Sequence, residues 1–236
     1  MVGQMSSEPE RLAALRNYDI LDTPPDGAFD RIATLAASCF RTPIALVTLV
    51  DEDRIWFKSR HGLGVEQIPR SPGLCASAIL SDAAYTVRDA LSDVRTLANP
   101  LVTGALGLRF YAAAPLITHD GFRLGTINVI DFAPRDFSAD DEKLLQHLSA
   151  LVVDLLELRL SARKTIGTLS QVLTGIKHPE ELAKLVTVCA WTNKIRIGGR
   201  WISFAQFMGD ELGLLVTHGM SPEAEEAFSK DLPPVQ

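Results

Sequence analysis

Two short stretches near the C-terminus, VCAWTNKIR and THGMSPEAE, have residue types and spacing that suit a metal site. Cys189 stands where the first cysteine of a C-x-x-C pair would stand, but Thr192 fills the second position. In the other stretch the matching positions hold Ser221 and Ala224, and neither residue supplies a thiolate. A structural zinc site takes about four ligands, whereas Cys189 and His218 together make two at most. We therefore expect no bound metal, and no other cofactor is indicated.

The rest of the chain lacks the patterns of the common catalytic sites. No Ser-His-Asp arrangement, H-E-x-x-H motif or phosphate-binding loop is present. The three cysteines, at positions 39, 75 and 189, are too few and too widely spaced for a disulfide framework. This cysteine usage favours a reducing compartment, so we expect a cytoplasmic protein. Because the catalytic patterns are missing, we also expect that the protein is not itself an enzyme.

Composition and charge narrow the class of protein further. The chain of 236 residues is 47% hydrophobic and 22% charged, which is typical of a globular protein. Its formal net charge of -6 argues against nucleic-acid binding, because nucleic-acid binders usually carry a basic face. No uncharged apolar stretch reaches about eighteen residues, so we expect no membrane span, and the N-terminus has no apolar signal core.

Apolar patterning predicts helices and strand hairpins in a fixed order. Residues 43–51, PIALVTLVD, are β-branched and apolar, which is typical of a strand buried on both faces. The expected elements are helices at 8–18 and 27–40, strands at 43–51 and 55–63, short helices near 75–82 and 99–106, an extended piece at 85–89, and strands at 109–117 and 122–131. This order predicts an α+β fold in which an antiparallel sheet of about five or six strands carries helices on one face.

A long helix is expected from Ser138 to Ile176, because Ser138 and Asp141 resemble a capping box and an apolar pattern follows. Leucines spaced four and three residues apart form a heptad seam at Leu144, Leu148, Leu151, Leu155 and Leu158. Such a seam is typical of a coiled coil, so we expect a homodimer through these residues. The alternative is an ordinary helix lying on the sheet, and Leu145, Val152 and Leu156 widen the stripe in that direction.

Six stretches together resemble a large bacterial subfamily of GAF sensory domains, a fold similar to PAS domains. They are RLAALRNYDILDTPPDGAFD, IALVTLVDEDRIWFKSRHGL, EQIPR, DVRTLANPLV, RFYAAAPL and GTINVIDFAPRDFS. The resemblance covers residues 8–160 almost without gaps. It implies the GAF fold and a role in bacterial signal transduction.

The C-terminal stretches resemble a short module that follows GAF domains and response-regulator receivers in bacterial signalling proteins. In that family the pattern is C-x-W-C-x-K-I-R followed by H-G-I-C-P-x-C, and this chain keeps only Cys189 of the four expected thiolates. We therefore divide the chain into a GAF domain at 1–160, a linking and dimerisation helix at 138–177, and a small αβ module at 178–236 that has lost its metal ligands.

Alternation along the last strand predicts where a GAF ligand would bind. Thr126 and Asn128 share a mixed face with Ile130, and a polar side chain in an apolar cavity needs a partner. The expected ligand-binding residues are Trp56, Phe57, Cys75, Ser77, Tyr85, Arg109, Tyr111, Thr126 and Asn128. A basic cluster near the first hairpin is interpreted as a solvated strand face, and it consists of Arg54, Lys58, Arg60 and Arg70.

The function expected from these observations is signal transduction without a catalytic output. The GAF domain would sense a small molecule or bind a signalling partner, such as a histidine kinase of a two-component system. Two alternatives stay open: a purely structural dimerisation or adaptor module with an empty pocket, and a GAF-fold free methionine-sulfoxide reductase. Cys75 is interpreted as a buried apolar thiol, with a redox role or attachment of a bilin chromophore as alternatives.

Overall fold

The computed structural model describes residues 7–175, 187–189, 192 and 194–210, and for residues 169–175 and 187 it describes the backbone alone. The chain divides into two compact units, Met1–Ile166 and Gly167–Gln236, which are described separately. Within the described ranges, no helix is long and apolar enough to cross a membrane.

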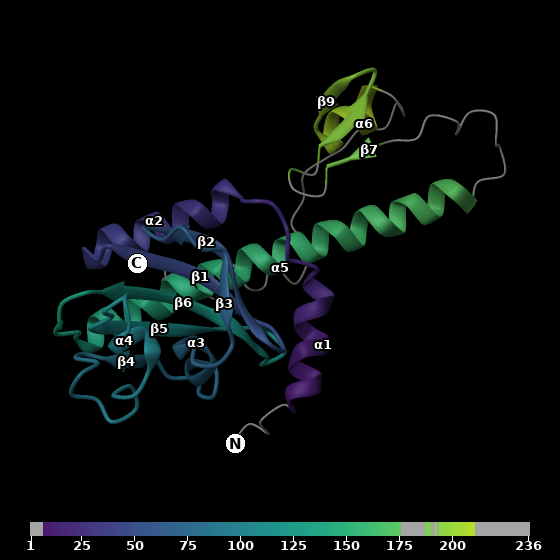
Figure 1. The fold of residues 1–236 in the computed structure, drawn as a ribbon. Coiled ribbons are helices and arrows are strands. Elements are labelled where there is room, and N and C mark those ends of the chain that lie inside the picture. The colour runs from purple at the N-terminus through teal and green to yellow at the C-terminus, as the bar shows by residue number, and fades with distance from the viewer. Residues whose placement is uncertain (1–6, 176–186, 190–191, 193, 211–236) are drawn as a thin grey trace, which may run out of the picture. The chain divides into compact units, whose positions relative to one another are not determined.

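The first unit is built on a six-stranded antiparallel sheet with the strand order β3-β2-β1-β6-β5-β4 (Figure 1). The strands are β1 (Ile44–Val50), β2 (Arg54–His61), β3 (Gln67–Pro69), β4 (Tyr85–Val87), β5 (Phe110–Ile117) and β6 (Arg123–Asp131). The long strands β1 and β6 lie at the centre, and every residue of β1 is buried. The expected α+β fold with five or six antiparallel strands is confirmed.

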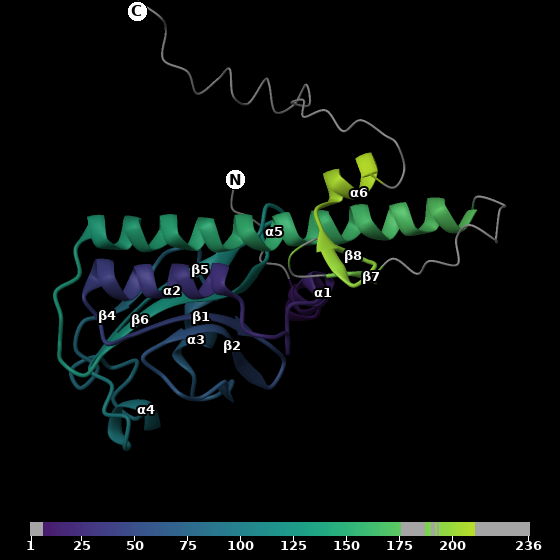
Figure 2. The same cartoon turned by 90° about the horizontal axis from the view of Figure 1, so that it is seen from above.

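Helices cover both faces of this sheet, although unequally. Figure 2 shows α2 (Gly27–Phe40) and α5 (Ala139–Gly175) side by side on one face, with α3 (Leu74–Ala78) on the other. The short helix α4 (Pro100–Thr103) belongs to the irregular segment between β4 and β5. Helix α1 (Glu8–Tyr18) packs against β6 through Leu12 and Leu15. Burial on both faces explains why β1 is apolar at every position except Thr48.

Helix α5 begins with the expected capping box, since Ser138 Oγ and the backbone N–H of Ser138 both donate to Asp141 Oδ2. Its inward stripe is fully buried and consists of Leu145, Leu148, Val152, Val153 and Leu156. Between these residues Ser149 Oγ donates a hydrogen bond of 2.6 Å to the carbonyl oxygen of Pro115 in β5. The helix is therefore fixed to the sheet by both apolar and polar contacts.

The predicted seam on α5 is wrong at Leu148, which is 4% exposed and packs within its own domain. A helix that lies on a sheet turns the wider apolar stripe inward, and Leu148 belongs to that stripe. Leu151 and Leu158 are 51% and 66% exposed, and Leu144 is also exposed, whereas Leu155 is half-buried. In the sequence the same spacing continues to Leu169, Val172 and Ile176, and these positions lie outside the described side chains.

The connection between α1 and α2 is held by side chains from α5. Arg159 forms an ion pair with Asp26, the residue that caps the N-terminus of α2. Arg163 forms an ion pair with Asp19, which ends α1. In addition, Tyr18 donates a hydrogen bond of 2.6 Å from its hydroxyl to Glu157 Oε1. The part of α5 at residues 157–163 thus contacts both N-terminal helices.

The described part of the second unit contains a three-stranded antiparallel sheet and one helix. The elements are β7 (Thr187–Val188), β8 (Ile195–Ile197), β9 (Arg200–Ile202) and α6 (Phe204–Asp210). Cys189 is half-buried and Thr192 is exposed, while His218, Ser221 and Ala224 lie outside the described residues. No group of three His, Cys, Asp or Glu side chains suited to a metal ion occurs in the ranges that the structure describes. The expected loss of the zinc site stays a prediction.

At Gly125 the backbone of β6 leaves no room for a side chain beside β1. A Cβ atom at this position would lie 1.9 Å from the carbonyl oxygen of Thr48 and 2.8 Å from Cα of Leu49. We expect Gly125→Ala to lower the free energy of unfolding by about 1–3 kcal/mol or more, because two backbones must separate. At Gly64 a Cβ meets nothing within 4 Å, so Gly64→Ala should change the free energy by less than about 0.5 kcal/mol. Urea unfolding of both variants is the measurement, and equal stability would contradict the packing described.

Candidate functional site

A cluster of buried polar side chains lies on the sheet face beneath α3. We name it the Asn128 cluster, and its members are Thr48, Cys75, Tyr111, Thr126 and Asn128. Asn128 Nδ2 donates to Thr126 Oγ1 at 3.0 Å and lies 3.6 Å from Cys75 Sγ. The Tyr111 hydroxyl donates to Cys75 Sγ at 3.2 Å. Thr48 Oγ1 and Thr126 Oγ1 are hydrogen-bonded at 2.9 Å. Four elements, β1, β5, β6 and α3, thus bring these groups together.

The surroundings of the Asn128 cluster are apolar, which affects the chemistry of its members. Ile44, Leu46, Phe57, Leu74 and Ile130 belong to the same buried cluster of side chains. Burial, together with the neighbouring Cys75, raises the pKa of Tyr111 well above its usual value. The tyrosine hydroxyl therefore stays protonated and acts as a hydrogen-bond donor to the thiol.

One polar atom of the Asn128 cluster has no partner. Asn128 Oδ1 is buried and accepts no hydrogen bond from any described residue. Exchanging the amide oxygen and nitrogen would leave the nitrogen without an acceptor at the same place, so one atom is orphaned in either orientation. An unsatisfied buried amide atom costs about 1–3 kcal/mol, and a ligand with a suitable polar group would remove that cost.

Several of the residues predicted to bind a ligand are indeed close to one another. Cys75, Tyr111, Thr126 and Asn128 form the Asn128 cluster, and the ring of Tyr85 packs edge-on against Tyr111 with centroids 6.1 Å apart. Phe57 contributes to the apolar surroundings on the same face. The alternation rule correctly placed the mixed face of β6 opposite the face that carries α2 and α5.

Three other predicted site residues lie elsewhere. Ser77 is exposed on the outer side of α3, so it does not belong to the Asn128 cluster with the other predicted ligand-binding residues. Trp56 points to the opposite face of β2 from Phe57, because successive strand residues alternate, and its ring contacts Lys58. Arg109 precedes β5 and pairs with Asp89 at 2.9 Å, outside the Asn128 cluster.

Lys58 is a buried cation that the sequence interpretation missed, since it was assigned to a solvated strand face. It is 3% exposed, and its Nζ donates to Thr23 Oγ1 at 2.9 Å and to the carbonyl oxygen of Pro24 at 2.8 Å. Burial lowers the pKa of Lys58 to about 8, although the charge of Asp30 acts in the opposite direction. The alternation that places Trp56 under α2 also places Lys58 there, and this signal was available in the sequence.

A cavity of about 650 Å³ opens on the outer side of α3. We name it the Arg70 cavity; residues that line it include Arg70, Ser71, Leu74, Ser77, Arg95 and Asn99. Cys75 and Asn128 are not among its lining residues, so it is separated from the Asn128 cluster by α3. Sequence analysis placed Ser77 at a ligand site, and the structure places it at this cavity instead.

The chain belongs to the GAF domain family. The family model of the GAF domain matches residues 24–154, which is more than half of the chain. The match begins just before α2 and ends within α5, so it includes the whole sheet and the Asn128 cluster. This agrees with the resemblance found in the sequence, while the resemblance of the C-terminal part to a cysteine-rich module stays a prediction.

Comparison with known proteins finds similarity to a curated relative and to several solved structures. A cyclic di-GMP phosphodiesterase from Pseudomonas aeruginosa is 41% identical over 147 residues, which are 62% of this chain and 25% of the relative. The GAF domain of an Acinetobacter phosphoenolpyruvate-protein phosphotransferase is 18% identical with a TM-score of 0.49, covering 68% of this chain and 99% of that structure. Free methionine-R-sulfoxide reductase from Neisseria meningitidis is 19% identical with a TM-score of 0.47, covering 66% and 96%. At these identities and TM-scores, nothing about the function of this chain is drawn from the two structures.

The expectation that the chain is not an enzyme is contradicted by the relative from Pseudomonas aeruginosa, whose name is that of an enzyme. The chain spans about a quarter of the length of this curated relative. A methionine-sulfoxide reductase would need nearby cysteines, but Cys39 is exposed on α2 and Cys75 is buried in α3, and these helices lie on opposite faces of the sheet. These two cysteines therefore form no redox pair in the described structure.

Proposed function

We propose that the GAF domain is a sensory input domain that binds a small molecule at the Asn128 cluster and regulates an enzyme of cyclic di-GMP signalling. Membership of the GAF family supports the sensory role, and the name of the 41% identical relative supports the signalling pathway. The other predicted partner, a histidine kinase or another signalling protein, stays a prediction.

The observation that carries this proposal is the orphaned amide atom of Asn128. A domain that used this region only for packing would gain stability from an apolar residue here, since the cluster is enclosed by Leu46, Phe57 and Ile130. The cover over the cluster is α3, a helix of only five residues. A small molecule that enters beneath α3 would displace few contacts and satisfy Asn128.

A bound molecule would be linked to α5 through strand β5. Tyr111 of β5 belongs to the Asn128 cluster, and the carbonyl oxygen of Pro115 in the same strand accepts the hydrogen bond from Ser149 of α5. A ligand that favours one position of β5 would therefore favour one position of α5. This is a shift between two populated states, and its size is limited by the difference in affinity for the two states.

Asn128→Cys tests the ligand site, because Cys offers only weak hydrogen bonds where Asn offers a donor and an acceptor. In a thermal-shift screen of small molecules we expect a hit whose affinity falls about fivefold or more in the variant, which corresponds to about 1 kcal/mol. The ligand-free melting temperature should change little. Asn17→Cys, at an exposed position of α1, is the matched control and should bind as the unmodified chain does.

The proposal fails if every hit stabilises the unmodified chain and Asn128→Cys equally. A screen without any hit would favour a purely structural module with an empty pocket.

We further propose that the domain forms a homodimer through the outward stripe of α5. Leu144, Leu151 and Leu158 are spaced seven residues apart and all are exposed. Burying a leucine contributes about 1.5–3 kcal/mol, so a few of them on each protomer offset the cost of association. Leu155 lies at the edge of this stripe, whereas Leu148 is unavailable to a partner.

The double substitution of Leu151 and Leu158 by Glu should give a folded monomer, because both side chains are exposed within the domain. Light scattering coupled to size exclusion measures the change in mass. Leu97→Glu is the control, since Leu97 is 47% exposed but lies between β4 and α4. A monomeric unmodified chain at high concentration would contradict the dimer.

A further inference from the structure

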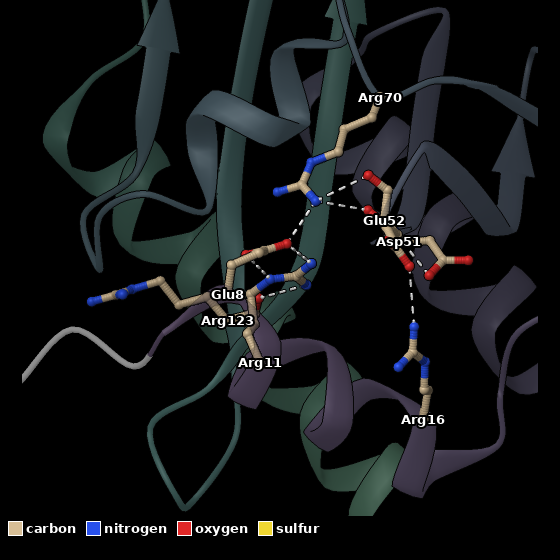
Figure 3. Close-up of polar contacts among 7 residues, drawn as sticks. All are labelled: Glu8, Arg11, Arg16, Asp51, Glu52, Arg70 and Arg123. Atoms are coloured by element: carbon tan, nitrogen blue, oxygen red, sulfur yellow. Dashed lines mark hydrogen bonds and ion pairs between the residues drawn. The ribbon is translucent and has the colours of Figure 1, made fainter.

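A three-way ion pair joins the first turn of α1 to the rim of the Arg70 cavity. Glu8 accepts two hydrogen bonds from Arg11, at 2.8 and 2.7 Å, and a third from Arg70 Nη1 at 2.6 Å (Figure 3). Arg11 lies on the same helix, so its bonds to Glu8 do not attach α1 to anything else. The bond from Arg70 is therefore the one that ties Glu8 to the segment following β3.

Arg70 uses only one of its nitrogens to hold this arrangement together. Besides Glu8, Nη1 donates to the carbonyl oxygens of Asp51 at 3.0 Å and Glu52 at 3.3 Å. Nε and Nη2 make no hydrogen bond with any residue that the structure describes, and Figure 3 shows Nη2 directed away from Asp51 and Glu52. The side chain is 25% exposed and lines the Arg70 cavity. The free edge of the guanidinium has the geometry that binds a carboxylate through two parallel hydrogen bonds.

Other residues of the cavity supply polar groups and limit the charge of a ligand. The hydroxyls of Ser71 and Ser77 have no hydrogen-bond partner within the described ranges. Glu52 and Asp53 also line the cavity, and Glu52 pairs with the exposed Arg16 at 3.3 Å. The negative charges of Glu52 and Asp53 repel a multiply charged ligand such as phosphate more strongly than they repel a ligand with a single carboxylate group. Arg95 is already held by Asp93 and does not replace Arg70.

We propose that the Arg70 cavity binds a small molecule through a single carboxylate group, and that this binding weakens the attachment of α1 at Glu8. The ligand carboxylate and Glu8 would share one guanidinium, so each reduces the attraction that Arg70 exerts on the other. The coupling is reciprocal, because a ligand that loosens Glu8 must bind more tightly when Glu8 carries no charge. The C-terminal end of α1 contacts Glu157 and Arg163 of α5. Release of α1 at Glu8 would therefore be transmitted to α5 through these contacts.

The present state of Glu8 agrees with this coupling. Its hydrogen bonds with Arg11, and then with Arg70, lower the pKa of Glu8 to about 2 despite partial burial. Glu8 is thus ionised at physiological pH and competes with any anion at Arg70. The site is distinct from the Asn128 cluster, and the two proposals fail independently.

The test uses pairs of ligands of matched shape: hexanoate and hexanamide, benzoate and benzamide, L-leucine and L-leucinamide. Titrations of the full chain are followed by NMR at constant ionic strength. We expect at least one acid to bind while its amide and inorganic phosphate do not. Arg70→Gln should abolish the binding, and Arg70→Lys should weaken it at least tenfold because Lys lacks the paired donors. Arg31→Gln, at an exposed position of α2, is the matched control and should change nothing.

The second arm of the test uses Glu8→Gln. Its affinity for the binding acid should rise about fivefold, at the low end of known coupling factors. Hydrogen exchange in residues 8–15 should be faster in this variant, and faster in the unmodified chain once the acid is bound. The proposal is overturned if no acid binds, if Arg70→Gln binds as well as the unmodified chain, or if Glu8→Gln does not bind more tightly. It is also overturned if Asn128→Cys removes the binding, and in that case the ligand site beneath α3 is supported.

Discussion

The docking of α5 on the sheet is the interaction on which the other contacts depend. Leu145, Val152 and Leu156 bury one side of the helix, and Ser149 fixes it to the backbone of β5. Because this position is set, Arg159 and Arg163 lie where they pair with Asp26 and Asp19. Arg159 also stacks over the ring of Phe29, with 4.8 Å from its Cζ to the ring centroid. A displacement of α5 would therefore disturb α1, α2 and the sheet together.

The two faces of the sheet have different roles because their buried groups differ in polarity. Toward α2 and α5 the central strands present Val47, Leu49, Ile127 and Val129, which favour tight and permanent packing. Toward α3 they present Thr48, Thr126 and Asn128 among apolar side chains, and one amide atom of Asn128 has no hydrogen-bond partner in the described part of the chain. A mixed face under a short helix is expected to be less stable than the purely apolar face, and ligand-binding regions are usually drawn from the less stable parts of a domain. This contrast supports a sensory region on one face and a transmitting helix on the other.

Features that depend on local patterns were predictable from the sequence. The strand hairpins, the capping box at Ser138 and the mixed face of β6 follow from alternation, turn residues and cap chemistry, and the structure has them. Features that depend on how elements pack were not. Leu148 satisfies both a heptad seam and a sheet-facing stripe, so spacing alone did not distinguish them. The outward position of Ser77 depends on how α3 is rotated on the sheet, and the role of Arg70 depends on a residue 62 positions earlier in the chain.

The most direct test of the central role of α5 is native-state hydrogen exchange of Arg159→Met. This change removes the ion pair with Asp26 but leaves the Asp26 cap and the apolar stripe of α5 in place. If α5 holds the N-terminal helices to the sheet, exchange should become faster across residues 19–31 and at the end of α1, while residues 145–156 stay protected. Faster exchange confined to the neighbours of residue 159 within α5 would contradict the account.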